Sequence, residues 1–306
     1  MYQKCTLCAH ACGVDRTRGI LGKCRSTDRP KIARAALHLW EEPPITGKNG
    51  SGTIFFSGCS LGCIYCQNHR ISRGDVGAPT TPDALVGTML SLEEQGATNI
   101  NFVTPTHYVP TLLYAIPEAR RLGLSIPIVY NTSSFERVET LRALDGLVDI
   151  YLPDFKYTDS RLAARYSGAP NYPEVAMRAI AEMMRQCPKP VFSESTALSP
   201  SSIETEPVRV MKRGTVARIL VLPEATANAK LAISRLYRTY GDNIFISIMG
   251  QYTPVGDLPA PLCRPLTHAE YNEVVSYAER LGVTNAFVQS LESAKESFIP
   301  EFNSQI

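Results

Sequence analysis

The chain has 306 residues and a mass of 33.6 kDa; 44% of its residues are hydrophobic and 20% are charged. A chain of this length and composition can bury a substantial core, which excludes intrinsic disorder and fibrous architectures for most of it. The 31 Lys and Arg residues nearly balance the 29 Asp and Glu residues and leave a formal net charge of +2. This charge lacks the basic excess of a protein that binds nucleic acid phosphates, so a nucleic acid partner is not expected.

The sequence contains no segment that predicts a membrane protein. Its longest uncharged run, residues 95–117, is interrupted by Asn, Thr, His and Pro residues, unlike a transmembrane helix. The first residues contain neither an apolar segment nor a small-residue cleavage site. We therefore expect a cytoplasmic protein with no membrane partner.

Short β-branched or aromatic runs alternate with longer helical patterns from about residue 50, which is typical of βα units and a parallel sheet. The expected strands are 53–57, 99–103, 126–131, 149–152, 190–193, 216–222, 244–248 and 286–289. The expected helices are 82–95, 110–122, 136–144, 172–186, 227–239 and 267–281. Candidate site residues recur where several of these strands end. The pattern therefore predicts an α/β fold, a full or partial (β/α) TIM-type barrel.

Two parts of the chain fall outside this alternation. Residues 1–49 form a small cysteine-rich extension with little apolar periodicity, so we expect metal ligation to order it, and residues 50–306 form the barrel domain. The stretch 195–206 is rich in Ser, Thr and Pro and predicts a surface loop.

Nine cysteines are an odd number, which argues against a closed set of disulfides. In a reducing compartment, clustered cysteines more often hold metal. Two of the nine, Cys187 and Cys263, stand alone and are expected to be small buried apolar side chains. The other seven form two groups, a first group of four within residues 5–24 and a second group of three within residues 59–66.

The second group, Cys59, Cys63 and Cys66, has C-x3-C-x2-C spacing on a loop directly after the first expected strand of the barrel. Three thiolates can hold a 4Fe-4S cluster and leave one of its four irons open. The amino and carboxylate groups of S-adenosylmethionine (SAM) can chelate that iron, and one electron then breaks the sulfur to C5′ bond to give a 5′-deoxyadenosyl radical, which abstracts hydrogen. The alternative is a zinc knuckle completed by a fourth ligand such as His69.

This loop resembles that of the radical SAM superfamily, and further segments resemble proteins related to pyruvate formate-lyase activating enzyme. These segments are 50–59, 101–107, 130–134, 149–156, 251–254 and 297–302. The resemblance implies an oxidoreductase with a 4Fe-4S cluster on Cys59, Cys63 and Cys66, with SAM as cofactor and a one-electron donor such as flavodoxin or ferredoxin. It also implies hydrogen abstraction from a backbone glycine of a partner glycyl radical enzyme.

The same resemblance implies a set of SAM-binding residues. Tyr65 would lie by the adenine. The segment formed by Thr104, Pro105 and Thr106 would take the place of a Gly-Gly-Glu segment that binds the SAM amino group. Asn131 and Thr132 would contact ribose or carboxylate, and Asp154 and Lys156 would lie near the methionine end of SAM.

Asp154 and Lys156 are also two residues apart on an extended segment, so their side chains share one face and could meet a zwitterionic amino acid. A surface ion pair is the alternative. His107, beside this site, is a candidate proton donor or ligand contact, and a structural histidine is the alternative.

Two features depart from the activating enzymes. They commonly carry an Arg-His pair on a late strand where this chain has Arg218-Ile219, and residues 193–212 do not follow the pattern of close relatives. Both departures favour a second hypothesis, the same radical chemistry on a small molecule or a peptide. A third hypothesis, from another class, is a cysteine-metal binding module without catalysis.

The first cysteine group, Cys5, Cys8, Cys12 and Cys24, supplies four thiolates. Four thiolates complete the shell of one zinc ion or of a second, closed 4Fe-4S cluster, and the sequence leaves both open. The neighbouring basic residues, Arg16, Arg18, Lys23 and Arg25, are few and lack aromatic partners, so we expect them on a solvated face rather than in an RNA site.

Overall fold

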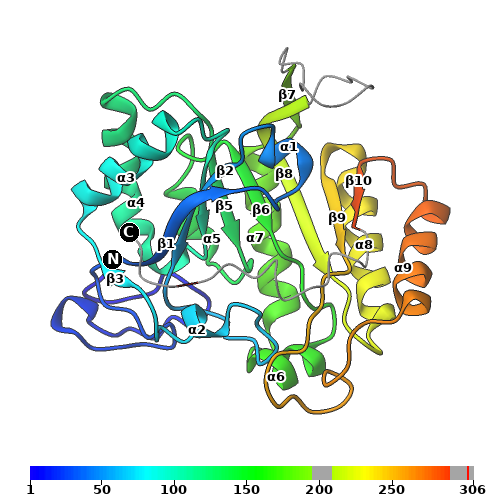
Figure 1. Ribbon diagram of the computed structural model, residues 1–306. Coiled ribbons are helices and arrows are strands. Elements are labelled where there is room, and N and C mark those ends of the chain that lie inside the picture. Colours follow the sequence, from blue (N-terminus) through cyan, green and yellow to red (C-terminus); the bar gives the residue numbers. More distant parts are fainter. Residues whose placement is uncertain (195–208, 290–301, 303–306) are drawn as a thin grey trace.

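A mostly parallel β-sheet forms the centre of the molecule, with helices packed around it (Figure 1). The computed structural model describes residues 1–194, 209–289 and 302. The strands are β1 (Lys31–His38), β2 (Ser51–Phe56), β3 (Ala78–Pro79), β4 (Ile100–Val103), β5 (Ile128–Thr132), β6 (Ile150–Pro153), β7 (Val191–Glu194), β8 (Arg209–Leu220), β9 (Phe245–Met249) and β10 (Ala286–Val288).

The α-helices are α1 (Pro43–Thr46), α2 (His69–Ser72), α3 (Pro82–Glu94), α4 (Val109–Arg121), α5 (Val138–Arg142), α6 (Ser160–Ser167), α7 (Tyr172–Gln186), α8 (Thr226–Tyr240) and α9 (His268–Leu281). Short 3-10 turns are η1 (Arg16–Arg18), η2 (Thr106–Tyr108) and η3 (Gly241–Asn243). All six expected helices are confirmed, whereas α6 was not expected. Local signals fix several starts; Thr267, for example, forms a capping box with Glu270 at the start of α9.

The strand order across the sheet is β10-β9-β8-β6-β5-β4-β2-β1-β3. From β2 to β10 each neighbouring pair is parallel, and β1 pairs antiparallel with both β2 and β3 at one edge. Strands β2, β4, β5 and β6 are buried along their whole length, as expected for parallel strands covered on both faces. The α/β prediction is therefore confirmed, and the path through the described strands is an open, partial barrel.

Two strands differ from the expectation. Residues 190–193 were expected to be a parallel strand of the barrel, but β7 pairs antiparallel with the first half of β8 and lies off the main path. The second half of the twelve-residue β8 takes the barrel position instead, beside β6 and β9. Residues 31–38 were not expected to form a strand, yet β1 lies in the sheet. The expected loop 195–206 lies outside the described residues, and the division at residue 49 stays a prediction.

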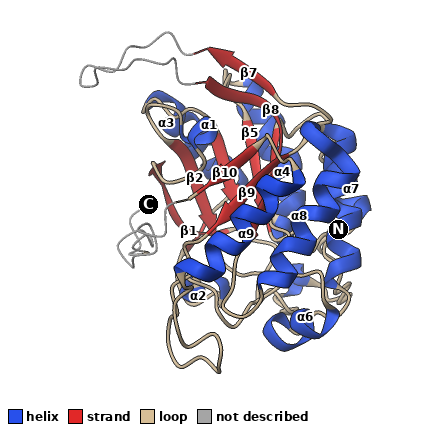
Figure 2. Ribbon diagram, turned by 90° about the vertical axis from the view of Figure 1, so that its right-hand side faces the viewer, coloured by secondary structure: helices blue, strands red, loops and turns tan. Residues whose placement is uncertain are grey.

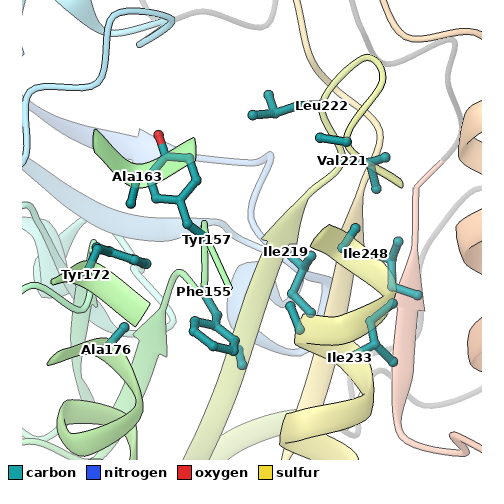
Figure 3. Packing of buried hydrophobic residues seen from close by; sticks show 14 of the residues in the cluster. Phe155, Tyr157, Ala163, Tyr172, Ala176, Ile219, Val221, Leu222, Ile233 and Ile248 are labelled. Carbon is teal, nitrogen blue, oxygen red and sulfur yellow. The ribbon is translucent and has the colours of Figure 1, made fainter. Parts of the chain in front are cut away.

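The largest buried cluster anchors the cysteine loop. Figure 3 shows part of this cluster, with Phe155, Tyr157 and Tyr172 on one side and Ile219, Ile233 and Ile248 on the other. Helices α8 and α9 pack against each other beside β9 and β10 (Figure 2). Leu61 and Tyr65, from the loop after β2, belong to the same cluster and are almost fully buried. Core packing therefore holds this loop in place.

Two other expectations concern single features. Cys187 is fully buried as expected, but Cys263 is exposed, so its expected burial was wrong: it lies in an exposed turn between β9 and α9. In the part of the chain that the structure describes, no helix has the length and apolar character needed to cross a bilayer.

Candidate active site

A cavity of about 640 Å³ lies inside the partial barrel. Residues at the carboxyl ends of β2, β5, β6 and β8 line it, as in barrels whose sites lie at that end of the strands. Residues 38–43 border the cavity near the amino ends of the strands, because His38 pairs with Ser51, the first residue of β2. The cavity therefore spans the inner face of the sheet.

The three loop cysteines, Cys59, Cys63 and Cys66, all line this cavity. The backbone N–H groups of Leu61 and Gly62 point at Cys59 Sγ, with N···S distances of 3.4 and 3.5 Å. Three thiols on one loop that line the same cavity, one of them facing two backbone N–H donors, supply the kind of ligand that an iron-sulfur cluster requires, so these residues fit a 4Fe-4S cluster with one open iron. His69 is absent from the cavity lining, which does not favour the zinc knuckle.

A chain of hydroxyl groups leads to the second of these sulfurs. Ser167 Oγ donates to Cys63 Sγ at 3.0 Å, Tyr157 lies 2.7 Å from Ser167, and Tyr157 also donates to the Tyr65 hydroxyl at 2.9 Å. The Tyr65 ring meets the rings of Tyr157, Tyr166 and Tyr252 edge-on. Tyr65 is thus a rigid aromatic wall of the cavity beside the cysteines.

Burial also controls the protonation of the loop thiols. It raises the pKa of Cys59 to about 12 and raises the pKa of Cys66, because a thiolate is poorly solvated there. Ligation by a metal needs the thiolate, so loading of this loop releases protons and weakens as pH falls.

Asp154 and Lys156 form an ion pair inside the cavity, with Oδ2 and Nζ 2.7 Å apart. Their side chains are only 19% and 18% exposed, so the alternative of a surface ion pair was wrong. Burial opposes both charges, but Lys156 and Arg218 outweigh it and lower the pKa of Asp154, and the Asp154 carboxylate raises the pKa of Lys156. Both residues therefore stay charged at neutral pH.

Arg218, on β8, joins this pair to the far side of the cavity. Its Nε lies 3.2 Å from Asp154 Oδ1, its Nη1 lies 3.2 Å from Glu41 Oε2, and its Nη2 donates to Asn131 Oδ1. Its side chain is 11% exposed. Burial opposes its charge, but the surrounding carboxylates raise the pKa of Arg218 further. Arg218 thus holds the charged groups of the cavity in one network.

Glu41 and Glu42 are lining residues that the sequence analysis missed. Asn101 Nδ2 donates to Glu41 at 2.9 Å, while Glu42 Oε2 is buried without a hydrogen-bond partner among the described residues. Burial raises the pKa of both carboxyl groups, and Arg218 opposes this rise. The signal that could have found them is an acidic pair directly before Pro43-Pro44, at a helix start after the unexpected β1.

The expected SAM-binding residues divide into two sets. Tyr65, Thr104, Asn131, Thr132, Asp154 and Lys156 all line the cavity. Pro105 and Thr106 do not; the Thr106 hydroxyl instead donates to buried Glu136 at 2.6 Å. Of the expected β4 segment, only Thr104 is therefore available for a bound molecule.

His107, the candidate proton donor, also lies outside the cavity lining. Its side chain is buried, and its Nε2 lies 2.8 Å from the Ser57 carbonyl oxygen, beneath the cysteine loop. Burial, with the charge of Arg16, lowers the pKa of His107 to about 3. This geometry favours the structural alternative over a role in proton donation.

The buried His107 gives a pH prediction. A histidine that is neutral when folded, with its pKa lowered from 6.5 to about 3, favours unfolding as pH falls below 6.5, because only the unfolded chain takes up the proton. Between about pH 6 and pH 4.5, the unfolding free energy should fall by up to about 1.4 kcal/mol per pH unit more in the intact protein than in His107→Gln. Anaerobic urea titrations would measure this difference. The exposed His268 supplies the control: His268→Gln should keep the intact slope, and the same slope in His107→Gln would contradict the prediction.

Gly58, directly before Cys59, gives a second prediction. Its φ is +89°, and an added Cβ would lie 2.5 Å from the Cys24 carbonyl oxygen. Gly58→Ala should therefore cost at least about 1–3 kcal/mol of unfolding free energy from backbone strain and should lower iron content. Gly62→Ala is a matched control, because Gly62 also has positive φ (+64°) but no atom within 4 Å of its added Cβ. Equal losses in both variants, measured by urea unfolding and iron analysis, would refute the steric argument.

Among protein families, the model described as the Radical SAM superfamily matches residues 53–206, half of the chain. Among curated proteins, an uncharacterized protein of Methanocaldococcus jannaschii is 32% identical in an alignment that covers 58% of this chain and 53% of the relative. The chain thus spans about half the length of that relative.

Two solved structures are similar to the fold. A radical SAM methyltransferase from Sphaerobacter thermophilus matches with a TM-score of 0.51 and 16% identity, over 78% of this chain and 66% of that chain. This likeness concerns the fold alone. A domain of pyruvate-formate lyase-activating enzyme from Bacteroides vulgatus matches with a TM-score of 0.40 and 14% identity, over 60% of this chain and 93% of that domain. A score this low carries no argument about the branch.

Proposed function

The chain belongs to the radical SAM superfamily, whose members use a 4Fe-4S cluster and SAM, and on that premise we propose that it cleaves SAM reductively and uses the resulting radical to abstract hydrogen. One observation carries the proposal: Cys59, Cys63 and Cys66 open into the same cavity as the charged network of Asp154, Lys156 and Arg218. The network offers opposite charges to a zwitterion next to the thiols that would hold the cluster.

We assign the following roles to residues of the cavity. Cys59, Cys63 and Cys66 hold the cluster, which supplies one electron to SAM when both are bound. Asp154 accepts the amino group of SAM, and Lys156 donates to its carboxylate. Because Arg218 and Lys156 keep Asp154 ionised, the carboxylate is ready to accept a cation at neutral pH.

Other lining residues complete this arrangement. Tyr65 offers the adenine a flat wall that neighbouring rings hold in place. Asn131 and Thr132, at the end of β5, can hydrogen-bond the ribose hydroxyls.

Two hydrogen donors are candidates. The resemblance to activating enzymes favours the first, a backbone glycine of a partner glycyl radical enzyme. The geometry around Arg218 favours the second, a small molecule or a peptide. Arg218 is held between Asp154 and Glu41, and beyond it Glu42 and Ser247 line a further part of the cavity. These polar walls lie within the barrel, where a small substrate or a side chain can reach them.

The test is anaerobic. The protein is reconstituted with iron and sulfide, mixed with SAM and dithionite, and 5′-deoxyadenosine is quantified against a variant in which Cys59, Cys63 and Cys66 are all Ala. Nucleoside from the intact protein alone supports the proposal. A SAM-binding cluster that gives no nucleoside with any reductant, flavodoxin and ferredoxin included, would overturn it.

The two targets give different products. A glycyl radical enzyme partner would show a doublet in its EPR spectrum after incubation, carried by the second polypeptide. A small-molecule or peptide substrate would instead give a new mass in a cell extract, together with extra 5′-deoxyadenosine. An EPR doublet on a partner protein excludes a small-molecule or peptide substrate only if no new mass appears in the cell extract.

A further inference from the structure

Arg16, between the N-terminal cysteines, is the largest fully buried side chain of the described residues, with none of its surface exposed. The expectation that it lies on a solvated face was therefore wrong. Its guanidinium lies between two aromatic rings, 4.7 Å from the centre of Tyr2 and 5.5 Å from that of Tyr108. The chain thus keeps a permanent positive charge in its interior.

The donors of Arg16 reach main-chain oxygens and one sulfur. Nε donates to the Ser26 carbonyl at 3.0 Å, Nη1 to the His107 carbonyl and Nη2 to the Thr27 carbonyl. Nη1 also lies 3.9 Å from Cys5 Sγ. Within the described ranges, no carboxylate lies within 4 Å of this guanidinium, and its charge has no anionic partner unless the thiols supply one.

A buried cation without an anion is strongly destabilising. Carbonyl dipoles and aromatic faces offset only part of this cost. The thiol of Cys5 lies against Arg16 Nη1, and the Arg16 side chain donates to the carbonyls of Ser26 and Thr27, two and three residues after Cys24. An anionic metal centre held by these cysteines would supply the missing negative charge.

The four N-terminal cysteines lie close to one another. Cys12 Sγ lies 3.9 Å from the Cys5 carbonyl oxygen, and Cys8 is near enough to Cys5, Cys12 and Cys24 for their charges to interact. Backbone bonds close the turn, since Cys5 N donates to the Val14 carbonyl at 3.0 Å and Gly13 N to the Cys5 carbonyl at 2.8 Å. An added Cβ on Gly22 would lie only 2.6 Å from Cys12 Sγ, so a residue without a side chain lets the two segments approach.

We propose that Cys5, Cys8, Cys12 and Cys24 hold a second, closed 4Fe-4S cluster, with Arg16 as its buried counter-charge. Cys5, Cys8 and Cys12 have C-x2-C-x3-C spacing, the reverse order of the C-x3-C-x2-C spacing of residues 59–66. Three thiolates within eight residues suit three corners of a cubane, whereas closed zinc sites commonly take their ligands as two separate pairs.

The geometry leaves the metal content as the decisive measurement. Among the described residues, no group of three or more His, Cys, Asp or Glu side chains is placed so that it could hold a metal ion without rearranging, and this applies to the loop 59–66 as it does to the N-terminal group.

This second centre would lie directly against the first. His10 Nε2 lies 2.9 Å from the Ser60 carbonyl oxygen, and Ala9 N donates to the Phe135 carbonyl at 3.2 Å. Gly58 packs against the Cys24 carbonyl, as described above. The N-terminal segment therefore packs against the loop that carries Cys59 through contacts that do not involve the four cysteine sulfurs, and the inference holds whether or not the protein cleaves SAM.

The experiment starts from the variant in which Cys59, Cys63 and Cys66 are all Ala, reconstituted anaerobically. We expect about four iron and four sulfide per chain in this variant, against about eight of each in the intact protein. Its reduced cluster should give an EPR spectrum that SAM does not change, because all four irons have protein ligands. A variant that folds, by circular dichroism, but holds no iron would overturn the proposal, and one zinc per chain would overturn the identity of the metal.

Matched variants separate ligation from folding. Cys8→Ser with Cys12→Ser should lose about half of the iron and keep the SAM-sensitive EPR signal, whereas Cys263→Ser, at the exposed lone cysteine, should lose none. We expect Arg16→Met, made in the variant in which Cys59, Cys63 and Cys66 are all Ala, to lower the reduction potential of the remaining cluster. Removal of a neighbouring cation disfavours the reduced form, which carries one more negative charge. Arg16→Lys keeps a cation there and should show a smaller shift. An unchanged potential in Arg16→Met would contradict the counter-charge role.

Discussion

Replacing Cys63 with Ala is expected to abolish formation of 5′-deoxyadenosine, down to the level of a protein-free control. Cys63 lies between the other two ligands of the loop and lines the cavity. The cluster needs a thiolate on each of three of its four irons. With only Cys59 and Cys66 left, we expect the cluster that reduces SAM to be lost. Anaerobic product analysis by mass spectrometry, with iron content measured on the same sample, would check this.

Ser167→Ala is the matched control for that loss. Ser167 only donates a hydrogen bond to Cys63 Sγ, at 3.0 Å, so this variant should keep its iron. Its cluster should have a lower reduction potential, because hydrogen bonds to sulfur stabilise the reduced state. If Cys63→Ala retained a SAM-sensitive cluster and full activity, the ligand assignment would be wrong.

Arg218→Met is expected to produce the largest loss of stability, about 3–5 kcal/mol of unfolding free energy, because it leaves the buried Glu41 carboxylate without its cation and leaves Asp154 paired with Lys156 alone among the described residues. Glu41 and Asp154, whose side chains are 8% and 19% exposed, both lie 3.2 Å from the guanidinium. The pKa of each carboxyl group should rise, and SAM affinity should fall as Asp154 loses its negative charge. Urea unfolding and equilibrium binding of SAM would measure the two effects.

An exposed ion pair provides the comparison for Arg218. Arg161 pairs with Asp159 at 3.2 Å, but its side chain is 93% exposed. Arg161→Met should therefore change stability far less than Arg218→Met does and leave SAM binding unchanged, because solvent screens an exposed pair. A similar small change in Arg218→Met would mean that the buried carboxylates become protonated without cost.

Local signals along the sequence were enough to predict most of the barrel. The strands that became β2, β4, β5 and β6 are short, largely apolar or β-branched runs, and two of the long helices, α3 and α9, begin at threonine caps. The cysteine loop was predictable because its chemistry lies within eight consecutive residues. The family match confirms radical SAM membership, while the roles of the individual site residues stay predictions.

The features that the sequence did not reveal depend on partners far away in the chain. Residues 31–38 contain three alanines and show no clear alternation, so only pairing with β2 makes them a strand. Residues 190–193 have strand character, but their antiparallel partner is the first half of β8. Arg16 looked like a surface residue, because its burial depends on Tyr108 and on the carbonyl of His107.

Strand β1 has a consequence for how this protein can vary. It starts shortly after Cys24 and ends shortly before Glu41, so one short strand connects the N-terminal cysteines with the carboxylates that pair with Arg218. A protein that lost the first 49 residues would therefore lose more than its N-terminal cysteines: it would also lose strand β1 and the residues from His38 to Pro43 that line the cavity. A shift of the N-terminal segment should consequently reach Glu41, and through it Arg218, along a single strand.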